Sequence, residues 1–204
     1  MSEMNPPSDH GTPEDRPTGT SDAESGVDIP EWAPMEPLPS SHMLLAAFDG
    51  KRLATARDIL DPAFDLVACQ KQYRLAFEML GKETVSAEQL WHAASELVTA
   101  QQDIEILIAI IDDAVADRLK QRIPVPSLPS HTASIDGLPL PPVHTESIGE
   151  IAARMADLWE AVTAKTNGQN GEDFPEAGQL LELCRGYDYL AAEIESGRRL
   201  LPGM

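Results

Sequence analysis

The chain has 204 residues, of which 42% are hydrophobic and only 5% aromatic, and its formal net charge is −19. This length allows one domain of ordinary size with tails, and the shortage of aromatic residues predicts a core of aliphatic side chains and alanine. The acidic balance disfavours binding to nucleic acid and to anionic membrane surfaces, because like charges repel. A basic partner or a cationic ligand is electrostatically easier to bind, but acidity is also a common route to solubility alone, which is the favoured interpretation.

Neither a signal peptide nor a membrane-spanning segment is recognisable. The N-terminus lacks a basic region followed by an apolar run, and no apolar stretch reaches the roughly 18 residues that a membrane span needs. The two cysteines, Cys69 and Cys184, lie within apolar patterns and form no CxxC motif, which is typical of buried free thiols. We therefore expect a cytoplasmic protein without a disulfide framework, a metal site or a cofactor.

Residues 1–42 differ in composition from the rest of the chain. They hold eight prolines and nine acidic residues but only one basic residue, Arg16. Such a segment cannot bury enough apolar surface to offset the entropy lost on ordering, so we expect a disordered acidic tail. The exception is the stretch 29–35, where Trp32 and Met35 are suited to dock on the domain or on a partner.

The helical domain is expected to begin near Met43. Ser41 is placed to cap a first helix, and Gly50 interrupts it before helical spacing resumes over 53–60. This start sets the N-terminal boundary of the predicted domain.

The dipeptide Asp61–Pro62 predicts the start of a second helix, because aspartate caps helices and proline suits their first position. The helix should end near Leu80, where Gly81 suits the left-handed conformation that follows many helices. Its expected buried side consists of Phe64, Val67, Tyr73, Phe77 and Leu80.

The longest predicted helix starts at a capping box formed by Ser86 and Gln89 and runs to about Gln121. Its apolar surface widens over 104–111, which predicts a central place in the domain for that turn. The expected buried stripe comprises Leu90, Ala94, Leu97, Ile104, Leu107, Ile108, Ile111, Val115 and Leu119.

Residues 123–144 contain six prolines, which exclude a regular helix and predict a long connection. Ser147 and Glu150 then form a second capping box, which opens a hairpin of two helices that ends at Gly197. The two expected buried stripes are Ile148, Ile151, Met155, Leu158 and Val162, and then Leu180, Leu183, Tyr187, Leu190 and Ile194.

These patterns predict an all-α fold. No segment alternates with the period of two that a half-buried strand requires, so we expect no sheet. The predicted architecture is an antiparallel helical bundle of four to five helices over 43–199, preceded by the disordered acidic tail (1–42) and followed by a short tail over 200–204.

Few groups of residues in the chain could form a metal-binding or catalytic site. Glu88 and His92 share one helix face and could contribute to a metal site, but a solvated polar face is the favoured interpretation. One carboxylate of Asp112–Asp113 is expected to approach the core near an arginine such as Arg154. A structural ion pair is the favoured interpretation, and an element of a functional site is the alternative. Phosphate-binding loops, nucleophile elbows and HExxH motifs do not occur.

The start of the predicted hairpin is the best candidate for a binding site. His144, Thr145 and Glu146 precede a helix N-terminus, whose free N–H groups suit an anion, and Arg154 lies two turns further on. Capping of the helix is the favoured role of the hydroxyl groups there, and ligand binding by His144, Thr145, Glu146 and Arg154 is the alternative.

Several short motifs follow one another in a suggestive order. The segment 90–93 (LWHA) opens the long helix, 110–113 (IIDD) follows it, 144–151 (HTESIGEI) leads to Arg154 and Met155, and 195–199 (ESGRR) closes the hairpin. This order resembles an uncharacterised bacterial family of helical proteins over about residues 86–199. The resemblance implies a helical fold and no particular reaction.

The leading functional hypothesis is a non-enzymatic interaction or scaffold protein that acts through a protein partner or as a homodimer. It rests on a clear bundle pattern without catalytic motifs. The alternative is a small-molecule-binding protein or enzyme with a pocket at the bundle end, covered by the 123–144 connection and lined by Thr145, Glu146 and Arg154. No catalytic residue can be named from the sequence.

Overall fold

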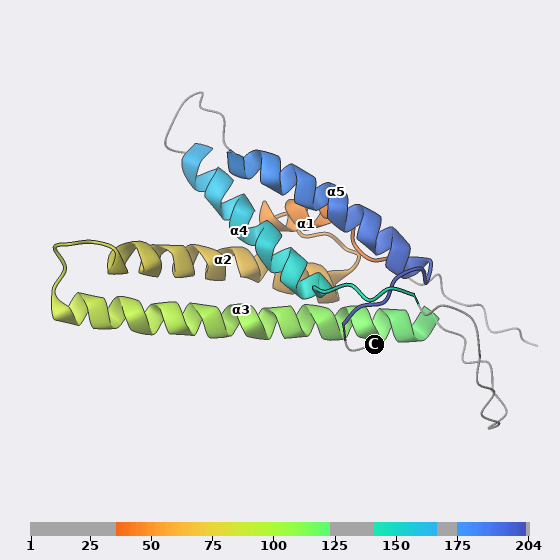
Figure 1. The fold of residues 1–204 in the computed structure, drawn as a ribbon, viewed down its shortest axis with the longest axis horizontal. Helices are drawn as coiled ribbons and strands as arrows, with labels where there is room; N and C mark the ends of the chain where they lie inside the picture. Colours follow the sequence, from red (N-terminus) through yellow and green to blue (C-terminus); the bar gives the residue numbers. More distant parts are fainter. Residues whose placement is uncertain (1–35, 123–140, 167–174, 203–204) are drawn as a thin grey trace, which may run out of the picture. The chain divides into compact units, whose positions relative to one another are not determined.

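The structure is a computed structural model that describes residues 36–122, 141–166 and 175–202, all of which belong to one compact unit. The predicted tail up to residue 35, including Trp32 and Met35, and most of the 123–144 connection lie outside the described residues. The described part holds five helices: α1 (Ser41–Phe48), α2 (Arg57–Leu80), α3 (Ala87–Arg122), α4 (Ile148–Thr166) and α5 (Pro175–Glu195) (Figure 1).

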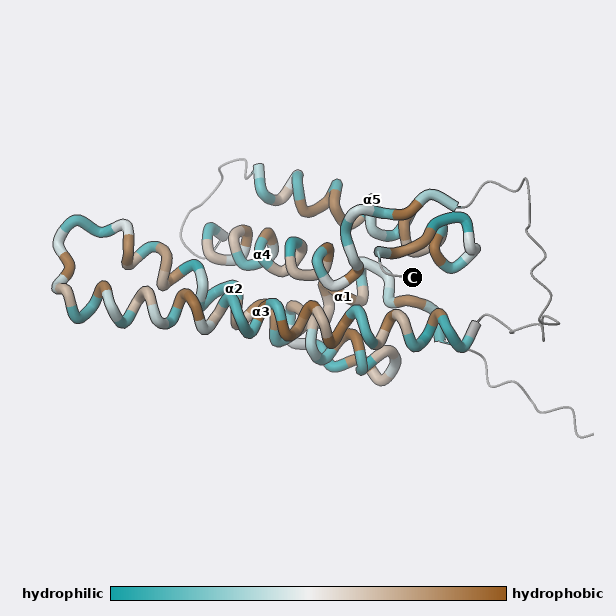
Figure 2. The backbone as a smooth tube through the Cα atoms, turned by 60° about the horizontal axis from the view of Figure 1, so that its bottom comes forward, coloured by the Kyte–Doolittle hydropathy of each residue, from teal (hydrophilic) through white to brown (hydrophobic). Residues whose placement is uncertain are grey.

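The helices pack as two antiparallel pairs. Helices α2 and α3 form a long hairpin, which α4 crosses obliquely, and α5 runs back along α4 (Figure 1). The short α1 contacts α2, α4 and α5. The end of the α2–α3 hairpin that holds its turn extends past α4 and α5 (Figures 1 and 2). The predicted all-α, antiparallel bundle is confirmed, and none of the described helices is both long and apolar enough to cross a membrane.

The core lies where α4 crosses the α2–α3 hairpin and continues under α1 and α5. The stripes predicted for α4 and α5 pack in it or against it, apart from the half-buried Val162. The α3 stripe is correct from Ile104 onward, but Leu90 and Ala94 near the start of α3 are exposed. The largest fully buried side chains include Leu44, Ile59, Leu66, Ile111, Ile148, Met155 and Tyr187.

The predicted start of the second helix at Asp61–Pro62 is wrong. Helix α2 begins at Arg57 and contains Pro62, after Ala56 in a left-handed conformation with φ 53°. The reason is burial: Ile59 and Leu60 are 0% and 3% exposed, and a helical start upstream places both in the core. Proline at the sixth position removes only one helical hydrogen bond, which this burial outweighs.

The predicted buried side of α2 is also partly wrong. Phe64 and Phe77 are 44% and 63% exposed, whereas small residues such as Ala63 and Ala76 are 0% and 2% exposed. Close packing of α2 against its neighbours favours small side chains at the contact, and this turns the large aromatic rings outward. The buried residues of α2 are Ile59, Leu60, Ala63, Leu66 and Ala76.

The folded domain extends further toward the N-terminus than predicted. Pro39 is fully buried, and its carbonyl accepts a hydrogen bond from the Tyr187 hydroxyl at 2.7 Å. Ser40, not Ser41, caps α1, because its side chain accepts from the Met43 N–H. Ser41 instead donates from its N–H and its hydroxyl to the Asp188 carboxylate at 2.7 and 2.6 Å. Residues 38–41 therefore pack with the helical domain, whose predicted start was residue 43.

The residues after α5 also belong to the domain. Leu200 forms a parallel backbone bridge with Val143, in which His144 N–H donates to the Leu200 carbonyl at 2.8 Å. Leu201 is 6% exposed. The short tail predicted over 200–204 is thus bound over 200–201, and this bridge holds the strand-like segment that leads into α4.

Candidate functional site

The start of α4 is built as the sequence predicts. The Ser147 hydroxyl accepts from the Glu150 N–H at 3.1 Å, and the Glu150 carboxylate accepts from the Ser147 N–H at 2.7 Å. The same reciprocal pair forms between Ser86 and Gln89 at the start of α3, with distances of 3.2 and 3.0 Å. Both predicted capping boxes are confirmed, so these hydroxyl groups serve the helix ends.

Gly149 lets the first turn of α4 touch α3. A β-carbon at Gly149 would lie 2.5 Å from the Ile108 carbonyl oxygen, which is too close for any other residue. The Gly149 N–H donates to Oδ1 of Asp112 at 2.8 Å. This carboxylate satisfies one of the free N–H groups at the helix end and complements the positive end of the helix dipole.

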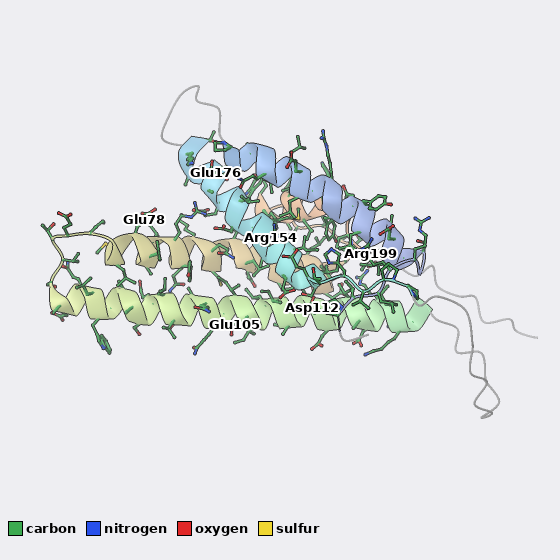
Figure 3. The ribbon with its side chains drawn as sticks, viewed as in Figure 1. Glu78, Glu105, Asp112, Arg154, Glu176 and Arg199 are labelled. Carbon is green, nitrogen blue, oxygen red and sulfur yellow. The ribbon has the colours of Figure 1, made fainter. Side chains whose placement is uncertain are left out.

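The expected ion pair between the Asp112–Asp113 pair and Arg154 is wrong. Asp112 binds the backbone of Gly149, and Asp113 is exposed. Figure 3 shows Asp112 on α3 beside the start of α4 and Arg154 further along α4. The guanidinium of Arg154 instead donates to both carboxylate oxygens of Glu146, at 2.7 and 2.8 Å.

The four predicted binding residues are only partly brought together. Glu146 and Arg154 pair with each other, and the Glu146 N–H donates to Nδ1 of His144 at 3.2 Å. Thr145 is exposed. Polar atoms at this helix start therefore bond mainly to one another.

A groove of about 420 Å³ lies between α2, α3 and the first turns of α4. Its polar side chains connect the helices: Arg74 donates to the Asp157 carboxylate at 2.7 Å, and Gln70 donates to the Ala153 carbonyl at 3.3 Å. Sequence analysis missed the α2 contribution, because no local signal places α2 beside α4. The groove is lined by Gln70, Tyr73, Ile108, Glu146, Glu150, Ala153, Arg154 and Asp157.

Within the residues that the structure describes, Glu88 and His92 on α3 are not part of a cluster of side chains that could bind a metal. Nε2 of His92 lies 3.4 Å from Oε1 of Glu96, and the His92 side chain is 71% exposed. In the described part of the chain, no three His, Cys, Asp or Glu side chains come together as a metal site requires. This pair has the geometry of a solvated surface contact.

Large apolar side chains are exposed along the α2–α3 hairpin. In the described part of the chain eleven large hydrophobic residues are exposed, and eight of them lie on these two helices, so the exposure is concentrated there. Trp91 is 74% exposed and Phe77 is 63% exposed. Figure 2 shows apolar positions along the hairpin end that extends past α4. The eight residues are Phe64, Leu75, Phe77, Leu90, Trp91, Val98, Ile106 and Ile110.

The sequence contains one indication of this exposed surface. Apolar residues surround much of the long helix over 104–111, which predicts a central place in the bundle. In the structure Ile108 meets α4, whereas Ile106 and Ile110 are 57% and 45% exposed. The widened apolar surface thus has one side in the core and another in solvent.

Comparison of the chain with known protein families, with curated proteins and with solved structures finds no match. The functional conclusion therefore rests on the geometry of the groove and of the exposed hairpin.

Proposed function

We propose that the protein is a non-enzymatic helical interaction protein whose docking element is the α2–α3 hairpin. The observation that carries the proposal is the exposure of large apolar side chains on this hairpin, above all Trp91 at 74%. Exposed large apolar side chains that gather on one element are characteristic of protein–protein contact sites, and tryptophan is over-represented among residues that dominate binding energy.

The packing of the hairpin supports this proposal. The residues buried between α2 and α3 toward the hairpin turn are alanines: Ala76, Ala93 and Ala100 are 2%, 5% and 0% exposed. Small side chains thus fill the most buried positions between the two helices there, and Leu80 and Leu97 are half-buried. Phe77, Leu90 and Trp91 lie on the outside, where they are available to a partner.

The groove at the start of α4 supports a ligand-binding function less well. Its arginine Arg154 is engaged by both oxygens of Glu146, and Asp157 is engaged by Arg74. A ligand would have to displace one of these pairs to reach a charge. The contacts from Gln70 and Arg74 to α4 also give the polar groups a structural role in holding α4 on α2.

A photo-reactive amino acid placed at Trp91 tests the proposal in cells of the source organism. We expect one discrete cross-linked partner, identified by mass spectrometry, because a docking surface holds its partner against this position. The matched control places the same group at Tyr189, which is 66% exposed on α5. Equal cross-linking from both positions, or none from Trp91, would contradict a docking role for the hairpin.

A further inference from the structure

The outer face of α3 combines apolar and acidic residues. Successive residues of a helix are turned by about 100°, so Trp91, Val98 and Ile106 fall within about 80° of one another. Ala100, which is 0% exposed, lies about 180° from Trp91 on the side toward the core. We define the outer face of α3 by its exposed residues Glu88, Trp91, Val98, Glu105, Ile106 and Asp113.

All the charged residues that define this face are acidic. No lysine or arginine occurs between residues 83 and 117. Among the described residues, the carboxylates of Glu88, Glu105 and Asp113 form no ion pair; Glu105 only accepts a weak hydrogen bond from Gln101 at 3.4 Å. The face thus offers apolar contacts over about 22 Å of helix, flanked by carboxylates that a partner can neutralise.

The acidic character of the outer face of α3 argues against its being covered by another segment of the same chain. The stretch 1–35 carries eight acidic residues and one basic residue, and the stretch 123–140 contains neither lysine nor arginine. A second copy packed face to face would bring the same carboxylates together and would be repelled. A basic partner is the occupant that the face complements.

Resting on the proposed function, we infer that the outer face of α3 binds a basic amphipathic helix. Apolar residues of that helix would cover Trp91, Val98 and Ile106, and its lysine or arginine residues would pair with Glu105 and Asp113. This is helix-on-helix recognition, in which apolar anchors at three- and four-residue spacing give affinity and flanking charges give selectivity.

A designed peptide of about 23 residues tests the inference, since a helix of that length spans the face from Trp91 to Asp113. One version carries leucine on one helical side and lysine beside it, and its counterpart carries glutamate in place of every lysine. Fluorescence anisotropy of the labelled peptides is measured with the full chain. We expect saturable binding of the lysine peptide and no measurable binding of the glutamate peptide.

Two pairs of variants localise the binding. Glu105→Lys should weaken binding of the lysine peptide about fivefold, because an attractive contact becomes a repulsive one. Its matched control, Glu182→Lys on α5, changes the net charge equally and should weaken binding less than about twofold. Trp91→Ser should weaken it about tenfold or more. Tyr189→Ser, which removes an exposed aromatic residue from α5, should leave it unchanged.

Several results would overturn the inference. These are equal binding of the two peptides, equal loss in Glu105→Lys and Glu182→Lys, or binding of the chain to zwitterionic vesicles instead of the peptide. A concentration-dependent dimer that Trp91→Ser abolishes would assign the face to a second copy. Cross-linking from Trp91 to a partner without a basic helix would refute the inference while leaving the proposed function intact.

Discussion

At the scale of single residues, the contact between α3 and α4 depends on a missing side chain. The Gly149 backbone lies against Ile108, and its N–H binds Asp112 at 2.8 Å. We predict that Gly149→Ala lowers the free energy of unfolding by about 1–3 kcal/mol, because the added methyl group forces the two backbones apart. Urea unfolding followed by circular dichroism measures the change.

Gly178 supplies the control for this substitution. It lies within α5, and a β-carbon there would meet nothing within 4 Å. Alanine should therefore stabilise the protein by about 0.5–1 kcal/mol, the ordinary gain in helix propensity. If Gly149→Ala behaved in the same way, the close approach of α4 to α3 would not exist in solution.

At the scale of elements, Arg118 ties α3 to α2 and to the segment before α1. Its side chain is only 13% exposed. The guanidinium donates to Asp58 on α2 at 2.9 Å, to the Glu36 carboxylate at 3.1 Å and to the Pro37 carbonyl at 3.3 Å. Sequence analysis does not find this role, because all three partners lie far from Arg118 along the chain.

The Arg118 contacts predict a specific dependence on pH. The hydrogen bonds from Arg118 lower the pKa of Asp58 below its ordinary value of 3.8. Folding is therefore favoured by this pair above pH 3.8, and the contribution is lost as the pH falls through the lower pKa of the folded state. We predict that Arg118→Met costs about 1–2 kcal/mol at pH 7 and that the difference from the parent narrows below pH 3.8.

The control for this prediction is Lys120→Met, which removes an exposed pair with Asp117. It should change the free energy of unfolding by less than about 0.5 kcal/mol at any pH. The measurement is urea unfolding between pH 3 and pH 7. A difference between Arg118→Met and the parent that is constant over this range would mean that Asp58 does not titrate against Arg118.

The start of a helix can be predicted from the sequence when neighbouring residues signal it. The starts of α3 and α4 are signalled locally, by Ser86 with Gln89 and by Ser147 with Glu150, and both were predicted. The start of α2 is decided by burial of Ile59 and Leu60 in a core that distant helices complete. A local signal at Asp61–Pro62 could not reveal that burial.

The candidate sites likewise combine contacts between residues close in sequence, which could be predicted, with contacts between distant helices, which could not. The pairing of Glu146 with Arg154 joins two predicted residues that are close in sequence. The rest of the groove comes from α2 and α3, whose position beside α4 no motif encodes. The exposed hairpin was missed for a related reason: Phe77 and Leu90 have the spacing of core residues, but none of the five described helices covers them. Apolar spacing predicts that a face needs a partner, and it leaves open which chain supplies that partner.

At the scale of the whole molecule, the charge sets how stability responds to salt. Acidic residues outnumber basic ones by 34 to 15, so ion pairs within the chain leave a large excess of carboxylates. Folding draws these carboxylates together, and their mutual repulsion opposes the compact state. Salt screens this repulsion and thereby stabilises the fold. It destabilises the contacts of Arg118, because the attraction between opposite charges weakens when salt screens it.

The repulsion is the larger of these two effects, because the chain after residue 35 still has 26 acidic and 14 basic residues, a net charge of −12, whereas the Arg118 cluster involves a few groups. We therefore predict that the urea midpoint of unfolding rises between about 10 and 200 mM sodium chloride, as the screening length falls below about 10 Å. Choline chloride should act equally, since screening does not depend on the cation, whereas an effect of sodium alone would indicate ion binding. A midpoint that falls with salt would show that specific ion pairs outweigh the repulsion. Arg118→Met should then respond less steeply than the parent.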